Sequence, residues 1–317
     1  MYLTITIDVE EDNWGQYHVK NPELTNIEKI PILQSIFDRF GIKPTYLITY
    51  PVATDYKSVS ILKKILDNDR CEIASHIHPW NTPPFEEEVD DRNTILCNLP
   101  KELQYKKIEA LHEKIFKNFG VEPISFRSGR WGYDENVAEN ILKLNYKVDT
   151  SILSFTDWSD IYGPNYSMIF PKTFKYCIEK NNSQKLQLLE VPGTVGYMNQ
   201  NFKLCNDIHN FVDKNKLKIF MMDGLFDHIQ FIKKIWLSPE TTNLNHMIKL
   251  VNNMVTNGYD LVNMFFHSAT LIPGYSPFVK NTDEEKVFIQ KIERFIEYIS
   301  ENNLKPIKLS ESINIYK

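Results

Sequence analysis

The sequence predicts an α/β protein built on a parallel sheet, and three observations support this prediction. Short apolar stretches typical of buried strands alternate with amphipathic helical stretches along the whole chain. Polar residues suited to catalysis follow many of these strands instead of one, which favours a closed barrel over an open doubly wound sheet. The chain has 317 residues, 42% of them hydrophobic, which is enough to bury a large core.

The first third of the chain contains the most regular alternation. A strand is expected over residues 2–8, because apolar and polar side chains alternate there. A helix is expected over 27–40, where apolar residues recur every three or four positions and Gly41 follows as a stop signal. The next expected elements are a strand at 43–49, a helix at 59–66 and a strand at 71–75.

The rest of the chain continues this alternation with one interruption. Helices are expected at 102–119, 136–144, 243–256 and 283–301. Strands are expected at 123–127, 146–150, 186–191, 216–221, 260–266 and 305–309. The spacing of strands and helices is poor between 155 and 240. We therefore expect a single domain over 1–317 with an irregular insertion around 155–240.

The overall composition argues against several classes of function. A net charge of −5 gives no electrostatic reason to expect a nucleic-acid partner. The sequence has no run of about 18 apolar residues, so insertion into a membrane is not expected. The chain starts with an alternating strand instead of a charged leader, which favours a cytoplasmic location. Its four cysteines are widely spaced, unlike a disulfide framework.

Two acidic residues lie at the end of the first expected strand. Asp8 and Glu10 are two positions apart, so their side chains point to the same face. Two carboxylates this close repel each other unless a cation, a base or a proton compensates. The alternative is that Glu10, Glu11 and Asp12 form the N-cap cluster of a helix.

Two histidines have the same spacing after the expected strand at 71–75. His76 and His78 would also share one face, and Pro79 follows directly. Neutral imidazoles are common zinc ligands, and zinc sites that keep one position open for water use three protein ligands. A carboxylate and two histidines supply that number, so we expect a divalent-metal site where the two strands meet. The alternative is a surface loop that carries two histidines.

An arginine and a histidine follow two other expected strands. Arg127 ends the strand at 123–127, and an arginine beside acids lowers their pKa values and fixes their geometry. For Arg130, a functional role and a structural ion pair at the barrel rim are both open. His267 directly follows the apolar strand at 260–266, a position that suits a general acid at the rim.

Five segments, taken in chain order, resemble the five motifs of the polysaccharide deacetylases, the NodB-like carbohydrate esterases. These segments are 6–10, 72–76, 126–130, 148–151 and 266–268. The resemblance extends from residue 2 to about residue 310, and it implies a metal-dependent enzyme on a distorted, TIM-like (β/α)₇ barrel. The Asp-Val-Glu and His-Ile-His-Pro-Trp variants resemble a subgroup associated with surface-polysaccharide synthesis.

The resemblance implies a role for each motif residue. Asp8 would be the general base and His267 the general acid. Glu10 and His76 would bind a divalent metal, with Zn²⁺ as the expected ion. Arg127 would hold the base in position.

Further residues are expected to support the reaction or to contact the sugar. Asp149 resembles the acid that lies behind the catalytic histidine, and Trp158 resembles a tryptophan that lines the acetyl pocket. Trp80, Arg130 and Trp131 lie within or beside the motifs, and we expect them to contact the substrate.

The chain departs from the family pattern at two metal positions. Glu10 replaces the usual aspartate, and glutamate is a chemically sound ligand. Trp80 replaces the second histidine of the family pattern. His78 is the nearest substitute, so it becomes the third ligand if its side chain reaches the cation.

The sequence therefore predicts a metal-dependent hydrolase that removes the N-acetyl group of an amino sugar in nucleotide-linked, lipid-linked or oligosaccharide form. A deformylase or another small amide hydrolase on the same scaffold is a chemical alternative, because a metal site does not identify the acyl group. A catalytically silent sugar-binding homologue, in which the shift to His78 has cost the metal, is a second alternative. A structural α/β protein with ion pairs at its rim is a third.

Overall fold

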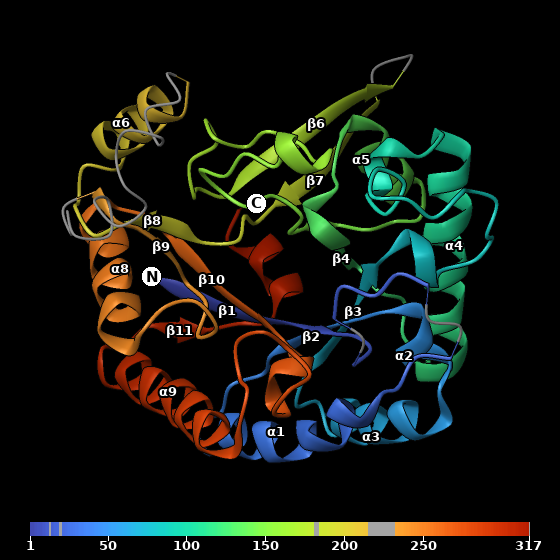
Figure 1. Ribbon diagram of the computed structural model, residues 1–317, viewed down its shortest axis with the longest axis horizontal. Coiled ribbons are helices and arrows are strands. Elements are labelled where there is room, and N and C mark those ends of the chain that lie inside the picture. Colours follow the sequence, from blue (N-terminus) through green and yellow to red (C-terminus); the bar gives the residue numbers. More distant parts are fainter. Residues whose placement is uncertain (13, 19–20, 181–183, 215–231, 317) are drawn as a thin grey trace.

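A nine-stranded sheet forms the centre of the protein (Figure 1). The structure is a computed structural model, and it describes residues 1–12, 14–18, 21–180, 184–214 and 232–316. The strands of the sheet are β1 (Tyr2–Val9), β2 (Thr45–Ile48), β3 (Glu72–Ile77), β4 (Ser125–Ser128), β5 (Val148–Asp149), β6 (Phe174–Lys180), β7 (Gln184–Glu190), β10 (Leu261–His267) and β11 (Lys305–Pro306). A separate two-stranded sheet consists of β8 (Val195–Tyr197) and β9 (Lys234–Trp236).

Seven of these strands are parallel neighbours, in the order β10, β1, β2, β3, β4, β5 and β7. β6 pairs with β7 in the antiparallel direction, and the short β11 pairs with β1. The register places Asp8 beside His267 and His76 beside Arg127 on adjacent strands. The carboxyl ends of the parallel strands thus bring the predicted site residues to one edge of the sheet.

The sheet curls into a distorted barrel that closes irregularly between β7 and β10. The backbone N–H of Thr194 donates to the carbonyl oxygen of Asn263 (3.3 Å), and the N–H of Asn263 donates to Oγ1 of Thr194 (2.8 Å). The N–H of Phe265 donates to the carbonyl oxygen of Leu237 (3.1 Å). Short irregular segments therefore close this side of the barrel, and the predicted distorted (β/α)₇ barrel is confirmed.

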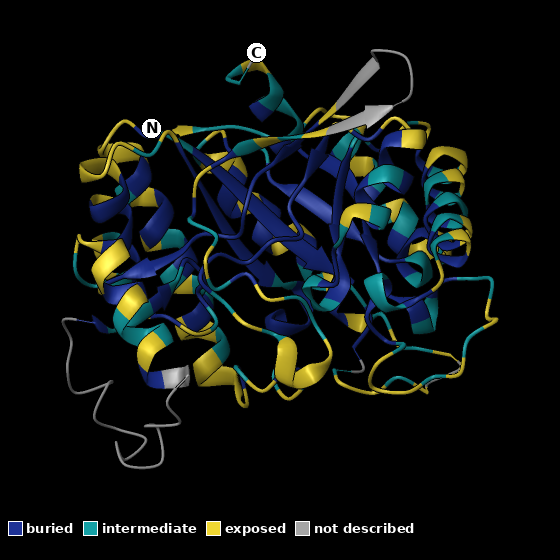
Figure 2. Cartoon of the chain, turned by 90° about the horizontal axis from the view of Figure 1, so that it is seen from above, coloured by how far each residue is buried: buried dark blue, intermediate teal, exposed yellow. Residues whose placement is uncertain are grey.

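Helices cover the outer surface of the barrel (Figures 1 and 2). In α9, Phe288, Ile292, Phe295 and Ile299 recur at helical spacing and are buried, so one apolar face packs inward while polar residues face water. Among the described residues, no helix is both long and apolar enough to cross a membrane. The α-helices are α1 (Ile30–Arg39), α2 (Tyr50–Thr54), α3 (Tyr56–Leu66), α4 (Lys101–Phe119), α5 (Glu135–Lys143), α6 (Phe202–Lys214), α8 (Leu244–Thr256) and α9 (Thr282–Glu301).

The inside of the barrel is polar along β1, which explains the alternation of its sequence. Thr6 Oγ1 donates to Oδ1 of Asn263 (2.9 Å) and accepts from Nη2 of Arg127 (2.7 Å). The intervening residues Leu3, Ile5, Ile7 and Val9 belong to the apolar core. The polar face of this strand therefore points inward and carries Asp8 to the rim, as the sequence predicts.

The stretch between 155 and 240 contains more regular structure than the sequence predicts. The strand expected at 186–191 is present as β7, which is itself one of the parallel barrel strands. The strands β6, β8 and β9 and the helix α6 are additional. The strand expected at 216–221 lies outside the described residues. The segment 155–240, which the sequence presents as an irregular insertion, thus contains the barrel strand β7.

Candidate active site

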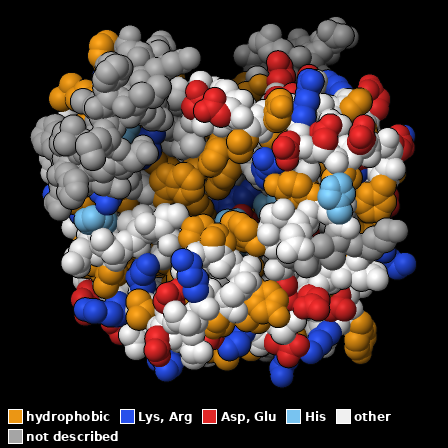
Figure 3. Space-filling view, viewed as in Figure 1, with side chains coloured by type: hydrophobic (Ala, Val, Ile, Leu, Met, Phe, Trp, Pro, Cys, Tyr) orange, Lys and Arg blue, Asp and Glu red, His pale blue; other side chains and the backbone are white. Residues whose placement is uncertain are grey.

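A cavity of about 310 Å³ opens at the carboxyl ends of the barrel strands. Figure 3 shows it as a central hollow whose edge is largely hydrophobic. All five tryptophans of the chain line it, namely Trp14, Trp80, Trp131, Trp158 and Trp236. The predicted site residues other than Asp149 also line this cavity.

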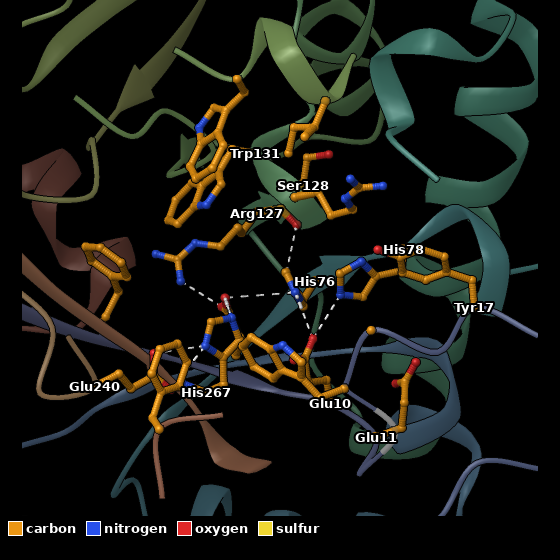
Figure 4. Close-up of a pocket in the computed structure, with 18 of the residues that line it drawn as sticks. Glu10, Glu11, Tyr17, His76, His78, Arg127, Ser128, Trp131, Glu240 and His267 are labelled. Atoms are coloured by element: carbon orange, nitrogen blue, oxygen red, sulfur yellow. Dashed lines mark hydrogen bonds and ion pairs between the residues drawn. The ribbon is translucent and has the colours of Figure 1, made fainter. Parts of the chain in front are cut away.

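Three potential metal ligands meet on one side of the cavity. One ligand atom each from Glu10, His76 and His78 lies within 4.8 Å of the others. Nε2 of His78 is 2.9 Å from Oε2 of Glu10, and Nε2 of His76 is 3.6 Å from the same oxygen (Figure 4). Two imidazole nitrogens and one carboxylate oxygen are donors that zinc binds. His78 thus lies within ligand distance of Glu10 and His76.

Neighbouring groups orient these three side chains. Nδ1 of His76 is 3.2 Å from the carbonyl oxygen of Arg127, which leaves Nε2 facing the cavity. Nδ2 of Asn26 donates to the carbonyl oxygen of Glu10 (2.8 Å). A Cβ at Gly129 would lie 2.1 Å from Nδ1 of His78, so only glycine leaves room for this ring.

The protonation of this group suits a cation. Burial lowers the pKa of His78. Burial would raise the pKa of Glu10, but hydrogen bonds with His76 and His78 hold it well below its usual range. An ionised carboxylate beside a neutral imidazole is the state in which these residues bind metals.

Asp8 lies beside the potential metal ligands and is held by a buried arginine. Nη1 of Arg127 donates to Oδ1 of Asp8 (2.7 Å), and Nε of Arg127 donates to the carbonyl oxygen of Thr150 (3.1 Å). Burial would raise the pKa of Asp8, but the charge of Arg127, followed by those of His76 and His267, brings it below its usual range. Asp8 is therefore ionised near neutral pH and able to accept a proton.

His267 faces Asp8 and is held from behind by Glu240. Nε2 of His267 is 3.7 Å from Oδ2 of Asp8, and its Nδ1 is 3.1 Å from Oε2 of Glu240. Thr270 Oγ1 also donates to Glu240 (2.6 Å), which fixes the carboxylate. Burial would lower the pKa of His267, but the charge and hydrogen bond of Glu240 raise it to about 10. His267 therefore carries a proton near neutral pH.

A row of neighbouring rings, tilted against one another, forms one wall of the cavity. The rings of His78 and Trp80 are 4.1 Å apart, and those of Trp80 and Tyr17 are 4.7 Å apart. The guanidinium of Arg130 lies 5.5 Å from the centre of the Tyr17 ring. This wall leads from a potential metal ligand to a positive charge.

A second aromatic group forms another part of the lining. Trp131 and Trp236 both contact the ring of Phe265, at 5.4 and 6.1 Å, and Trp158 contacts Trp236 at 6.1 Å. Aromatic faces of this kind stack on the apolar faces of sugar rings. The cavity therefore combines charged groups with flat apolar surfaces.

The turn after β4 has an unusual backbone. Arg130 and Trp131 both adopt left-handed conformations, with φ of +52° and +57°. Residues other than glycine rarely do so, and such conformations cluster at functional sites. The turn follows Ser128 at the end of β4, and the side chains of both Arg130 and Trp131 line the cavity.

No protein-family model and no curated protein matches the chain, whereas solved structures do. A Mycobacterium smegmatis protein assigned to the polysaccharide deacetylases is similar over 96% of this chain and 92% of its own, with 13% identity and a TM-score of 0.50. The PuuE allantoinase is similar over 97% of this chain and 87% of its own, with 11% identity and a TM-score of 0.51. The chain has the polysaccharide deacetylase fold.

The deacetylase fold does not by itself identify the reaction. A 4-α-glucanotransferase from Thermococcus litoralis is similar over 99% of this chain and 40% of its own, with 11% identity and a TM-score of 0.56. Proteins with such different names share the fold at low identity, so the likeness shows architecture alone. The function must be argued from the site residues.

Asp149 does not occupy the place that the sequence resemblance implies. On the paired strands, Asp149 is in register with Phe126 and with Glu190, whereas Arg127, the neighbour of Phe126, points into the barrel. Alternation therefore turns Asp149 to the outer face, away from His267. It accepts hydrogen bonds from Ser151, and burial raises its pKa. The prediction that Asp149 lies behind His267 is therefore wrong. Glu240 occupies that position instead.

The sequence pattern did not indicate Glu240, the carboxylate that contacts Nδ1 of His267. It lies four residues after β9, within the stretch that the sequence presents as irregular. An acid after a short strand is too common a pattern to single out, and its contact with His267 spans 27 positions of the chain. Tyr17 and Trp236 were likewise missed, because their role depends on which rings the fold brings together.

Proposed function

We propose that this chain is a metal-dependent hydrolase that removes an acetyl group from the nitrogen of an amino sugar. One observation carries the proposal. An ionised Asp8 and a protonated His267 face each other 3.7 Å apart, beside the potential metal ligands Glu10, His76 and His78. Amide hydrolysis requires a base that takes a proton from water and an acid that gives one to the departing nitrogen.

Glu10, His76 and His78 are the residues that would hold the cation. Their two nitrogens and one oxygen fit zinc, and the three ligands leave room for water. When bound, such an ion supplies Lewis acidity, which polarises the acyl oxygen and makes a water molecule more acidic. The position of His78 argues against the silent homologue, which required this side chain to miss the cation.

Asp8 and His267 divide the proton transfers between them. Asp8 accepts a proton from water as the water oxygen bonds to the acyl carbon. The bond from carbon to nitrogen then breaks, and His267 gives its proton to that nitrogen. An amine is a very poor leaving group without this proton. The products are acetate and a sugar with a free amine.

Two further residues hold the acid and the base in place. Arg127 keeps Asp8 ionised and oriented, and Arg127 is itself fixed by Thr6 and Thr150. Glu240 keeps His267 protonated and directs its Nε2 toward Asp8. Such positioning lowers the cost of bringing the groups together during the reaction.

The aromatic lining supports a sugar as the substrate. Five tryptophans around one cavity offer flat apolar faces, and the charged groups lie among them. Amino sugars present both an apolar ring face and an acylated nitrogen. An oligosaccharide and a nucleotide-linked or lipid-linked sugar would each offer this unit.

The proposal is tested by acetate release. The zinc-loaded protein is incubated with N-acetylglucosamine oligomers, and acetate and free amine are quantified in equal amounts. Asp8→Asn should lower kcat by about 100-fold or more, because general-base catalysis contributes roughly 10²–10⁴. Asp207→Asn on the exposed side of α6 is the matched control. Release of formate from N-formyl analogues without release of acetate would favour the deformylase alternative, and hydrolysis of neither analogue would reject an amide hydrolase.

A further inference from the structure

Among the described residues that line the cavity, Arg130 is a cation that forms no ion pair with a carboxylate. Each carboxylate of the lining is already engaged: Asp8 with Arg127, Glu10 with His78, Glu240 with His267, and Glu11 with Asn81 and Thr49. Among the described residues, no carboxylate forms an ion pair with Arg130, although it lines the same cavity. Figure 3 shows basic side-chain atoms in and beside the hollow.

The guanidinium of Arg130 is held by neutral groups that do not use up its donors. Nη1 donates to the carbonyl oxygen of Asp91 (3.1 Å) and to the hydroxyl of Thr94. The ring of Tyr17 packs against the same guanidinium. Neither Nε nor Nη2 donates to a described residue. An oriented guanidinium whose Nε and Nη2 donate to no described residue suits an anion that offers two oxygens.

The position of Arg130 relates this charge to the proposed reaction. The row of tilted rings runs from His78 through Trp80 and Tyr17 to Arg130. A sugar ring lying along this wall would place its acylated nitrogen near His78 and another substituent near Arg130. The guanidinium would therefore meet a second group of the substrate and not the acetyl group.

We propose that Arg130 binds an anionic substituent, a phosphate or a carboxylate, on the amino sugar. This inference rests on the proposed function, because it names the substrate class of the same cavity. Bidentate binding of such a group by arginine adds both affinity and orientation. Neutral amino sugars then bind more weakly than their charged counterparts.

Binding is measured by calorimetry, so that the result does not depend on turnover. The ligands are N-acetylglucosamine 1-phosphate, N-acetylmuramic acid and neutral N-acetylglucosamine, each with the zinc-loaded full chain. A charged ligand should bind more tightly than the neutral one, and Arg130→Gln should reduce this preference about 10- to 100-fold. Which charged ligand shows the preference distinguishes phosphate from carboxylate.

Two comparisons separate Arg130 from other sources of attraction. Arg92→Gln removes the same charge from an exposed position outside the cavity lining, and it should keep the preference. If the metal binds the anion instead of Arg130, the Arg130→Gln variant would still bind the charged ligand more tightly than the neutral one. That result would overturn the proposal. Equal binding of charged and neutral sugars by the wild-type protein would also overturn it.

The two proposals fail in different ways. Tight binding of a charged sugar that depends on Arg130, without release of acetate, would support the anion site and contradict the deacetylase function. Acetate release with no preference for charged sugars would support the deacetylase function and contradict the anion site. Circular dichroism and thermal unfolding of Arg130→Gln check that the left-handed turn keeps its fold.

Discussion

At the scale of single residues, the proton on His267 depends on one carboxylate. Glu240 contacts Nδ1 and raises the pKa of His267 to about 10, against the effect of burial. Because the general acid must be protonated, its contribution is present below this pKa and is lost as pH rises through it. The alkaline limit of activity should therefore report on Glu240.

We predict that Glu240→Gln moves the alkaline limb of the pH–rate profile to lower pH. Without the carboxylate, the pKa of His267 falls toward or below about 6.5, so kcat/KM at pH 8.5 should drop at least about 10-fold. Asp149→Asn is the comparison, because Asp149 lies on the outer face of the sheet. If the alkaline limb moves in Asp149→Asn and stays in place in Glu240→Gln, Asp149 would be the acid that supports His267, as the sequence resemblance implies.

The placement of the site residues could be predicted where one strand carries the pattern. Asp8 with Glu10, and His76 with His78, share a face because strand side chains alternate, and both pairs reach the cavity. The positions of Arg127 and His267 were predictable because His267 is the last residue of its strand and Arg127 the last but one. Glu240 was not, since its position depends on how a loop folds against β10.

At the scale of elements, the turn after β3 is tied to helix α4 by a buried lysine. Nζ of Lys107 donates to the carbonyl oxygens of Pro79 (2.9 Å) and Thr82 (2.7 Å), and it pairs with Glu87 (2.7 Å). The Lys107 side chain is fully buried. This contact holds the turn that carries Trp80 next to His78.

We predict that Lys107→Met destabilises the protein by about 3–5 kcal/mol, because it leaves the carboxylate of Glu87 buried without its partner. Urea denaturation measures the change in the free energy of unfolding. The double variant Lys107→Met/Glu87→Gln should recover part of the loss. A loss below about 1 kcal/mol in the single variant would show that the pair does not stabilise this turn.

The close contact between the β4 turn and His78 gives a second prediction at this scale. Gly129→Ala places a Cβ 2.1 Å from Nδ1 of His78, so the ring must move and zinc affinity should fall by at least about 10-fold. Gly258→Ala is the matched control: its Cβ meets no atom within 4 Å, but its φ is +72°. The control should lose about 1–2 kcal/mol of stability and keep its zinc affinity. Equal zinc affinities in the two variants would show that Gly129→Ala does not displace the His78 ring from the zinc site.

Elements with strong periodic patterns were predictable, and those fixed by distant contacts were not. The strand at 2–8 and the helix at 283–301 match β1 and α9 within one or two residues. The strands β8 and β9 pair across 37 or more positions, so no local pattern identifies them. β6 was not predicted either, although its antiparallel pairing with β7 is local and joins residues 4 to 16 positions apart.

At the scale of the whole molecule, the proposed metal site connects β1 with β3. Glu10 directly follows the first strand, and His76 and His78 lie at or beyond the end of β3. A cation bound there is bound by the folded state, because the unfolded chain does not bring these residues together. Zinc binding should therefore stabilise the entire barrel.

We predict that zinc at about 100 times its Kd raises the free energy of unfolding by about 2.7 kcal/mol. Thermal unfolding with zinc and with a chelator measures this effect. Glu10→Gln should lose most of the zinc-dependent shift, while Glu11→Gln, which keeps all three potential ligands, should retain it. An identical shift in wild type and Glu10→Gln would place the bound zinc elsewhere.

The closed shape of the barrel was predictable only in part. Polar residues at the ends of many strands favoured a barrel, and seven parallel strands confirm it. The irregular closure through Thr194 and Leu237 was not predictable, because it depends on a few contacts with β10, mostly between backbone groups, that lie far apart in the sequence.

The most direct test of the account is a crystal structure of the zinc-loaded protein with anomalous diffraction measured at the zinc edge. The account predicts one strong peak about 2.0–2.2 Å from a carboxylate oxygen of Glu10, Nε2 of His76 and Nε2 of His78, beside Asp8. A peak elsewhere, or a zinc ion that His78 does not touch, would contradict it.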